Sequence, residues 1–459
     1  MIYRSLCCCF AKAARSSDTT KRNSLNKVVG SPPAVVLNPI VDMTQKPGYK
    51  WSKWDELGAT SLKTALLDTT MIDAAWLADL ADSGGVLPRC QDVPAEAQVS
   101  LAEMEAWNIT STVGALVISY PWLERNHPDP HGEQLRKISF VLKLFAAHAR
   151  QHYPGCRVGV FWDYCSLPQK DFNGVDDRIE EEKATFKRAL KGINAWYGHM
   201  KTHVLLVTTP LPEGHAYTNT QLYKGRGWCY AEMVMSGIVK DDMALIDMSK
   251  LKGDETTLGQ LKQKGKAERQ PPIAPDDFRA TLRSGIKTGK IKFTNKGDIE
   301  LVADIYERAF ICEMSTATQL NFGALNWDDE QVTILSAALA SAHARGGLKE
   351  VKELILSANK LGDKSCATLS EAFVKGALPN LESLDLRGDR IGNAGCATLA
   401  EALAKGALPQ LKYLGLYGNP ASEEAQKAVH PGGAASGTQP CVGARGLMVD
   451  VSGGAWHTC

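Results

Sequence analysis

Short apolar runs alternate with longer amphipathic segments between residues 111 and 250. Four runs, at 115–118, 158–162, 204–208 and 243–246, have the continuous apolar character of strands that are covered on both faces. In the segments between them, of which 135–149 is the clearest, apolar residues recur every three or four positions, as in amphipathic helices. Strands that alternate with helices of this length predict an α/β fold with a parallel sheet and right-handed crossovers.

A second pattern, with a period of 30 residues, occupies residues 354–419. Three positions recur at this period: Leu354, Leu384 and Leu414; Leu356, Leu386 and Leu416; Asn359, Asp389 and Asn419. We expect the leucines to point into the core of a solenoid, and the Asn or Asp to turn the chain after each strand. The pattern resembles the leucine-rich repeat in its long, ribonuclease-inhibitor-like form, with residues 334–344 as the helix of a degenerate first repeat.

Changes in composition divide the rest of the chain around these two patterns. The first residues are basic and nearly free of acids, whereas the last thirty are rich in Gly, Ala and Pro. The predicted order is a disordered basic tail at 1–45, a helical cap at 46–110, an α/β domain at 111–250, a helical brace and linker at 251–325, leucine-rich repeats at 326–430 and a flexible tail at 431–459. Residues 451–459 resemble the opening strand of a chromosome-condensation-regulator propeller repeat, but one partial unit cannot build a blade.

The charge and the cysteine pattern exclude several classes of protein. The formal net charge of +1 gives no global field for nucleic acid, so we predict no nucleic-acid partner. The 12 cysteines are scattered and form no zinc-type cluster, which predicts no metal site and a reducing, cytoplasmic location. No apolar run is long enough to span a bilayer. One local basic run could contact phosphate or RNA, although a solvated surface is the simpler interpretation: Lys287, Lys290, Lys292 and Lys296.

The basic tail contains three consecutive cysteines, Cys7, Cys8 and Cys9. Cysteines beside basic residues can be S-acylated, which would attach the protein reversibly to a membrane. The same segment is basic and contains serines, as organelle transit peptides do. A tail without any targeting role is a third interpretation, and the sequence leaves all three open.

Three short motifs within the α/β region combine polar and aromatic residues. They are Ser119-Tyr120-Pro121-Trp122 at the end of the first predicted strand, Asp163-x5-Gln169 after the second, and Trp228-x3-Glu232 on a predicted helix. In open α/β sheets, binding sites form beyond the carboxyl ends of the strands, so we expect the first two motifs to lie close together. The four-residue spacing of the third places its indole and its carboxylate on one face of the helix.

The three motifs, in this order, resemble those of the heterokaryon-incompatibility (HET) domain. The region is also similar to the Toll/interleukin-1 receptor (TIR) domain, some members of which carry Trp-Cys-x-x-Glu on a helix. The two families are thought to share a fold, so the resemblance implies a flavodoxin-like parallel sheet. The chain departs from the TIR pattern where Ala115-Leu116-Val117 replaces Asp-Ala-Phe, and in the loop after the second strand, which lacks Arg-Asp-x-x-Pro-Gly.

The resemblance implies an activity centred on Glu232. In enzymatic TIR domains the helix glutamate is required to cleave NAD at the nicotinamide–ribose bond, and a carboxylate can stabilise the oxocarbenium-like cation that forms there. NAD is therefore the candidate substrate, and no separate cofactor is implied. The resemblance makes Trp228 a wall of the pocket and places five further residues around it: Ser119, Tyr120, Trp122, Asp163 and Gln169.

Purely structural interpretations of these residues remain open. Asp163 could cap a helix or a turn, Glu232 could pair with Arg226 or a lysine, and the tryptophans could be core anchors. Two functions therefore follow. One is an intracellular signalling or defence-type protein that hydrolyses NAD and binds a protein partner through its repeats. The other is a non-enzymatic adaptor whose α/β domain self-associates. A nucleotide-switched receptor is excluded, because the chain has no G-x-x-x-x-G-K-[ST] motif.

Overall fold

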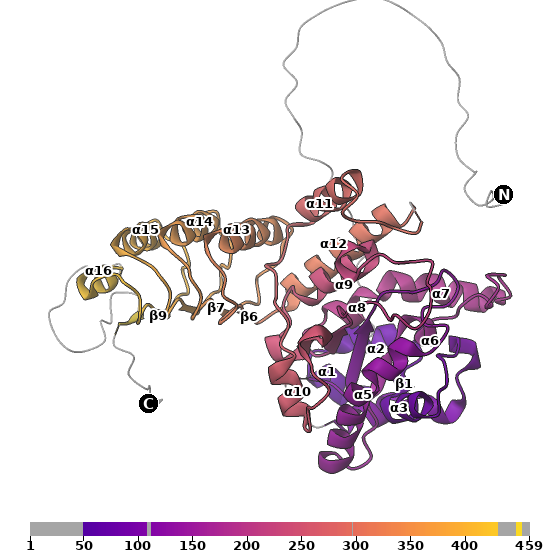
Figure 1. Ribbon diagram of the computed structural model, residues 1–459. Helices are drawn as coiled ribbons and strands as arrows, with labels where there is room; N and C mark the ends of the chain where they lie inside the picture. Colours follow the sequence, from indigo (N-terminus) through magenta and orange to yellow (C-terminus); the bar gives the residue numbers. More distant parts are fainter. Residues whose placement is uncertain (1–48, 108–111, 296, 430–446, 452–459) are drawn as a thin grey trace, which may run out of the picture. The chain divides into compact units, whose positions relative to one another are not determined.

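The computed structural model describes residues 49–107, 112–295, 297–429 and 447–451, which contain two sheets with helices packed around them (Figure 1). The first sheet has the strand order β1-β3-β2-β4-β5, and the second has the order β10-β9-β8-β7-β6. The predicted α/β class, with parallel sheets, is confirmed. The predicted tail at 1–45, with Cys7, Cys8 and Cys9, lies outside the described residues.

Four strands of the first sheet are parallel, and each overlaps one of the predicted apolar runs: β2 (Ala115–Ser119), β3 (Gly159–Phe161), β4 (His203–Leu206) and β5 (Leu245–Asp247). Along β2, Leu116 and Ile118 join the core on one face of the sheet, whereas Ala115 and Val117 join the core on the other. All four side chains are buried. The run is apolar at every position because both faces are covered.

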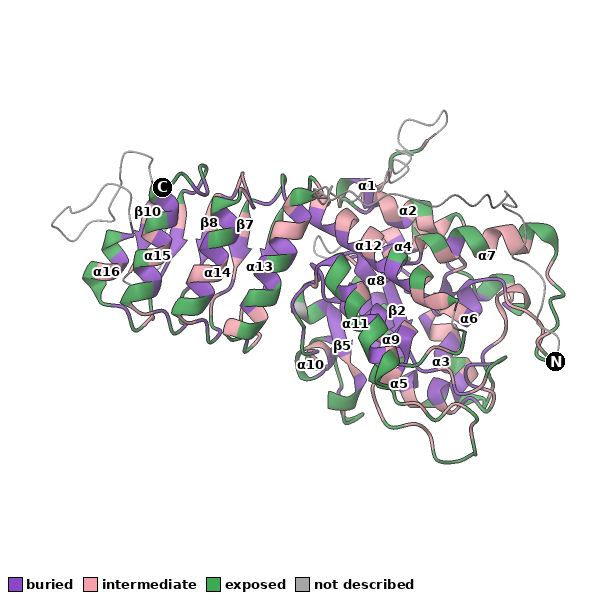
Figure 2. Ribbon diagram, turned by 90° about the horizontal axis from the view of Figure 1, so that it is seen from above, coloured by how far each residue is buried: buried purple, intermediate pink, exposed green. Residues whose placement is uncertain are grey.

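Helices cover the two faces of this sheet. On the face of Leu116 lie α3 (Ala74–Asp82) and α5 (Glu133–His152), and on the other lie α8 (Asn194–Gly198), α9 (Gly227–Ser236) and α12 (Asp298–Thr316). The strands between them are buried, while the outward sides of the helices are exposed (Figure 2). The remaining helices of this part are α1 (Lys53–Glu56), α2 (Thr60–Leu66), α4 (Leu101–Glu105), α6 (Asp163–Ser166), α7 (Glu180–Gly192), α10 (Leu258–Lys264) and α11 (Pro275–Lys287).

The predicted helical cap at 46–110 needs one correction. The described part of this region contains the helices α1 to α4, but less than half of it is α-helical, and β1 (Ile72–Asp73) pairs antiparallel with β3 at the edge of the sheet. The carboxylate of Asp73 then accepts a hydrogen bond from the Ala75 N–H at 3.0 Å and begins α3. Two extended residues directly before a helix are too short to produce a strand periodicity, so the pattern predicted helix throughout.

The second sheet is parallel throughout and contains β6 (Gln319–Asn321), β7 (Glu353–Ile355), β8 (Ser383–Asp385), β9 (Tyr413–Gly415) and β10 (Met448–Asp450). Helices α13 (Asp329–Ala344), α14 (Asp363–Val374), α15 (Asn393–Ala404) and α16 (Glu423–Ala428) pack in sequence order beside it (Figure 1). The register aligns Leu354, Leu384 and Leu414, and all three side chains are buried. The 30-residue period therefore corresponds to one strand and one helix.

The second sheet extends beyond the predicted repeat region, 326–430, at both ends. β6 lies in the segment predicted as brace and linker, yet it pairs with β7. β10 lies in the segment predicted as a flexible tail at 431–459, and it extends the sheet beyond β9 with Leu447 and Val449 buried. The prediction of a flexible tail is therefore wrong for residues 447–451. The segment that resembles a propeller repeat, 451–459, lies outside the described residues except for Val451.

A ladder of side-chain hydrogen bonds connects the turns that follow the strands. Asn359 Nδ2 donates to the carbonyls of Phe322 and Leu356, and Asn419 Nδ2 donates to equivalent carbonyls. Asp389 accepts from the Asn359 and Leu361 N–H groups through Oδ1, but its buried Oδ2 has no hydrogen-bond partner among the described residues. An aspartate has no amide nitrogen to donate, and burial raises the pKa of Asp389 to about 7.

Asp389→Asn should therefore stabilise the protein. The raised pKa means that the folded protein holds this proton up to about pH 7, so stability is lost as the pH rises through that value. We expect the variant to gain about 1 to 3 kcal/mol of unfolding free energy at pH 8 and less at pH 5. Urea unfolding at pH 8 and at pH 5 measures both free energies. Asn359→Asp is the reverse control, and it should destabilise the protein. If Asp389→Asn gains no unfolding free energy at pH 8, the buried Asp389 carboxyl does not destabilise the protein.

Candidate active site

The three motifs meet at the carboxyl ends of β2 and β3. Ser119 is the last residue of β2, and its hydroxyl donates to Glu232 Oε2 on α9 at 2.5 Å. Asp163 begins α6 directly after β3. It accepts from Tyr120 OH at 2.8 Å and from Trp122 Nε1 at 3.0 Å. The residues come together because parallel neighbouring strands end at the same edge of the sheet.

A pocket with a volume of about 670 Å³ lies at this edge. Six of the seven predicted site residues line it: Tyr120, Trp122, Asp163, Gln169, Trp228 and Glu232. The seventh, Ser119, is fully buried behind the Glu232 carboxyl and supports it. The first turn of α9 and the loop at 218–221 also contribute to the lining.

Glu232 is a buried carboxyl that is held by hydroxyl groups. Ser119 Oγ lies 2.5 Å from Tyr223 OH, and because Ser119 donates its proton to Glu232, Tyr223 must donate to Ser119. Burial raises the pKa of Glu232 to about 8, the hydrogen bond from Ser119 lowers it, and the charge of Asp163 raises it further. At neutral pH this carboxyl is therefore mostly protonated, and a positive charge beside it would favour its ionisation.

Asp163 both stabilises the turn after β3 and lines the pocket. Its Oδ1 also accepts from the Tyr164 N–H at 2.7 Å, which secures the turn after β3, and the same carboxylate lines the pocket. Burial raises the pKa of Asp163, and the hydrogen bonds from Tyr120 and Trp122 oppose this shift. Gln169 reaches the same place, since its Nε2 donates to the Asp163 carbonyl at 3.3 Å.

Two other structural interpretations are settled by the contacts. Arg226 does not pair with Glu232: its guanidinium donates to the backbone carbonyls of Trp122, Asn219 and Gln221. Trp122 and Trp228 are half-buried and line the pocket, so they are not simple core anchors.

One wall of the pocket was not predicted from the sequence. It comes from the predicted brace and consists of Lys292, Phe293, Thr294 and Asp298. Trp228 Nε1 donates to Asp298 Oδ2 at 3.0 Å, so the indole is fixed by the start of α12. The ring of Phe293 lies so close to Gly227 that a Cβ there would meet a ring carbon at 2.1 Å. Lys292 stands in the basic run noted above, but no local signal indicates that this run packs on α9.

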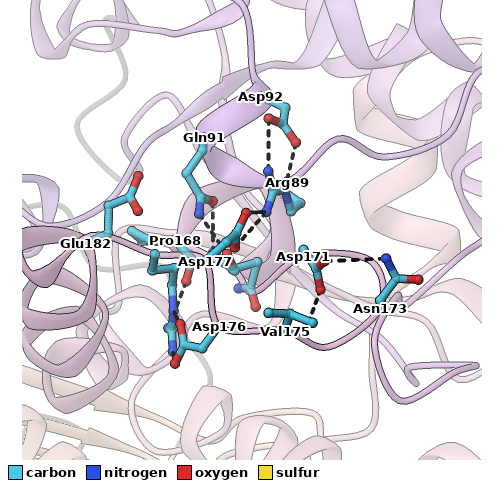
Figure 3. Close-up of polar contacts among 12 residues, drawn as sticks. Arg89, Gln91, Asp92, Pro168, Asp171, Asn173, Val175, Asp176, Asp177 and Glu182 are labelled. Atoms are coloured by element: carbon cyan, nitrogen blue, oxygen red, sulfur yellow. Dashed lines mark hydrogen bonds and ion pairs between the residues drawn. The ribbon is translucent and has the colours of Figure 1, made fainter.

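The rim of the pocket includes the loop that follows β3 (Figure 3). Its start is fixed by a pair of hydrogen bonds, in which Gln91 Nε2 donates to the Gln169 carbonyl at 2.7 Å and the Gln169 N–H donates to Gln91 Oε1 at 2.9 Å. Further along, Arg89 lies between Asp92 and Asp177 and forms ion pairs with both. Three apolar side chains of this region nevertheless face solvent, with exposures of 61 to 65%: Phe172, Val175 and Ile179.

The comparisons with known proteins assign no family to this chain. No protein-family model matches it, and no curated protein matches it either. Within the described ranges, no group of three or more His, Cys, Asp or Glu side chains could hold a metal ion. In the same ranges no helix is long and apolar enough to cross a membrane. The chemistry of the pocket must be argued from its own residues.

The raised pKa of Glu232 predicts a pH dependence of stability. The folded protein holds a proton on Glu232 up to about pH 8, whereas the unfolded chain releases it near pH 4.5. The free energy of unfolding should therefore fall as the pH rises between these values. In Glu232→Gln this contribution is absent, so the loss between pH 5 and pH 8 should be smaller by on the order of 2 to 4 kcal/mol.

Urea unfolding of both proteins at pH 5 and pH 8, followed by tryptophan fluorescence, measures this difference. Glu180→Gln is the matched control, because Glu180 is exposed on α7 and its substitution should leave the wild-type pH dependence intact. Equal pH dependence in the wild type and Glu232→Gln would mean that Glu232 ionises normally.

Proposed function

We propose that the α/β domain is a TIR/HET-like hydrolase that cleaves the N-glycosidic bond of NAD or a related pyridine nucleotide. The observation that carries this proposal is the place of Glu232. Its carboxyl lines the pocket beside the end of the sheet, one helical turn after Trp228, and Ser119 donates a hydrogen bond to it. This is the arrangement that the motif resemblance implies.

The topology supports the same assignment. The four parallel strands are β2, β3, β4 and β5 in chain order. In the sheet they lie in the order β3-β2-β4-β5, so the first two strands of the chain have exchanged places and the order is 2-1-3-4. This order supports the flavodoxin-like proposal, because flavodoxin-like sheets have the order 2-1-3-4-5 and bind ligands where the order reverses, next to the first strand. The residues that follow β2 and β3 line the pocket at this position.

The chemistry of the pocket fits a substrate with a cationic ring. When a pyridinium–ribose bond breaks, the ring leaves as a neutral base with both bonding electrons, and the ribose carbon becomes oxocarbenium-like. Water then adds to this carbon and releases a proton. In this proposal the pyridinium charge favours ionisation of Glu232 on binding, and the resulting carboxylate stabilises the cation at the ribose carbon.

The activity is tested by incubating the full chain with NAD and measuring nicotinamide release by chromatography. We expect Glu232→Ala and Glu232→Gln to lose at least about a hundredfold in rate, since both remove the only ionisable group of that side chain. The exposed Glu180→Gln variant should retain the wild-type rate. Turnover that survives in Glu232→Ala would show that the site is assigned wrongly. No turnover at any protein concentration would remove the enzyme proposal.

A second candidate function is a non-enzymatic adaptor that acts through self-association of the α/β domain. It is favoured by Phe172, Val175 and Ile179, which are exposed on a loop that ion pairs and hydrogen bonds hold in place. A fixed apolar surface loses little conformational entropy when it is covered by a partner. Under this proposal the wild type self-associates at high concentration in sedimentation experiments, whereas Phe172→Ser combined with Val175→Ser stays monomeric.

The second sheet supports the proposal of a ribonuclease-inhibitor-like leucine-rich-repeat module that binds a protein partner. The support consists of the strand–helix period of 30 residues, the parallel register and the Asn/Asp ladder. The proposed location is the cytoplasm. Membrane attachment through acylated Cys7, Cys8 and Cys9 stays a prediction, because these residues lie outside the described part of the chain.

A further inference from the structure

The pocket wall contains a buried cation, Arg226, that forms no ion pair with a carboxylate of the described residues. Arg226 is only 7% exposed, and it lines the pocket. Its Nε donates to the Gln221 carbonyl at 2.6 Å and its Nη2 to the Asn219 carbonyl at 2.8 Å, while Nη1 donates to the Trp122 carbonyl. Burial lowers the pKa of Arg226, but a guanidinium stays charged at neutral pH. Carbonyl groups orient this charge without cancelling it, and two of its five N–H bonds have no acceptor among these contacts.

A second cation is held beside it by the backbone. Lys292 and Arg226 are paired in a parallel β-bridge, in which the Lys292 N–H donates to the Gly225 carbonyl at 2.8 Å and the Gly227 N–H donates to the Lys292 carbonyl at 2.9 Å. Both residues line the pocket, and in the described residues neither forms an ion pair with a carboxylate. The Phe293 ring packed on Gly227 holds this pair of segments together.

The carboxylates that line the same pocket are engaged by neutral donors. Glu124 accepts from the N–H and the hydroxyl of Thr218. Asp298 accepts from Trp228 Nε1 and, at 2.9 Å, from Asn295 Nδ2. Asp163 accepts from two aromatic side chains, as described above. Arg226 and Lys292 form a cationic wall where α9 begins, and Asp298, which lies at the same place, forms no ion pair with either of them in the described residues.

The start of α9 strengthens this cationic wall. The helix runs over ten residues from Gly227, directly after Arg226, and it packs against α8 and α12 (Figure 1). Its first residues, Gly227, Trp228 and Cys229, line the pocket. The positive end of the helix dipole therefore adds to the charges of Arg226 and Lys292 at the same place.

We propose that Arg226 and Lys292 form a phosphate-binding subsite of the pocket, so that its ligand is a phosphorylated N-riboside and not a free nucleoside. Phosphate oxygens accept charge-assisted hydrogen bonds from both cations and compensate the buried guanidinium. The cleaved bond at Glu232 is taken from the proposed function, but the subsite rests on the charges alone. In this arrangement the phosphate lies against Arg226 and Lys292, and the cationic ring lies near Glu232.

The subsite is tested with ADP-ribose, which carries the diphosphate but lacks the nicotinamide–ribose bond. Calorimetric titration of the full chain should show binding that weakens by about tenfold or more in Lys292→Ala and further in Lys292→Glu. Lys292 is exposed, and its backbone contacts survive both substitutions. Lys290→Ala is the matched control: it removes an equally exposed lysine of the same run that does not line the pocket, and it should leave the affinity unchanged.

The outcomes separate this proposal from the hydrolase proposal. Lys292-dependent binding of ADP-ribose without any nicotinamide release would keep the subsite and remove the hydrolase. Equal rates of nicotinamide release from NAD and from nicotinamide riboside, in the wild type and in Lys292→Ala, would keep the hydrolase and overturn the subsite. Failure of ADP-ribose to bind the wild type at millimolar concentration would also overturn it, as would equal losses in Lys292→Ala and Lys290→Ala.

Discussion

The hydrogen bond from Ser119 to Glu232 is the contact on which the site depends. It joins the last residue of the central strand to a helix more than a hundred residues later in the chain, and it places a carboxyl at the end of the sheet. Tyr223 completes the arrangement by donating to Ser119. A carboxyl in this position is costly to ionise, since burial raises its pKa. The Glu232 carboxyl is therefore mostly neutral at neutral pH, and a positive charge bound beside it would favour its ionisation.

The segment at 291–298 turns the end of the sheet into an enclosed pocket. Phe293 packs against Gly227, and Asp298 holds the Trp228 indole, so this segment and the start of α9 position each other. The same contacts bring Lys292 beside Arg226. A domain that ended with the last strand of the first sheet would contain Glu232 but would lack one wall of the pocket and one of its cations, Lys292.

The amino-acid sequence predicts those features that depend on local patterns. Apolar runs covered on both faces predicted the parallel strands, and the 30-residue period predicted the strand–helix units of the second sheet. Strand ends predicted that Tyr120 and Asp163 would lie close together, which their hydrogen bond confirms. The sequence did not predict Lys292 in the pocket, or β10 beside β9, because a periodicity shows which face of a segment is buried and not which distant segment covers it. The suggested pairing of Glu232 with Arg226 was wrong for a related reason. Backbone carbonyls bind the guanidinium, and because every residue has a carbonyl, the sequence does not show which of them an arginine contacts.

The most direct test of the central claim is a crystal structure of the full chain carrying Glu232→Gln, with NAD bound. We expect the pyridinium ring to lie against Trp228 with its ribose carbon beside residue 232, and the diphosphate to contact Arg226 and Lys292. NAD bound outside this pocket, or bound with its nicotinamide end away from residue 232, would show that Glu232 is not the catalytic residue.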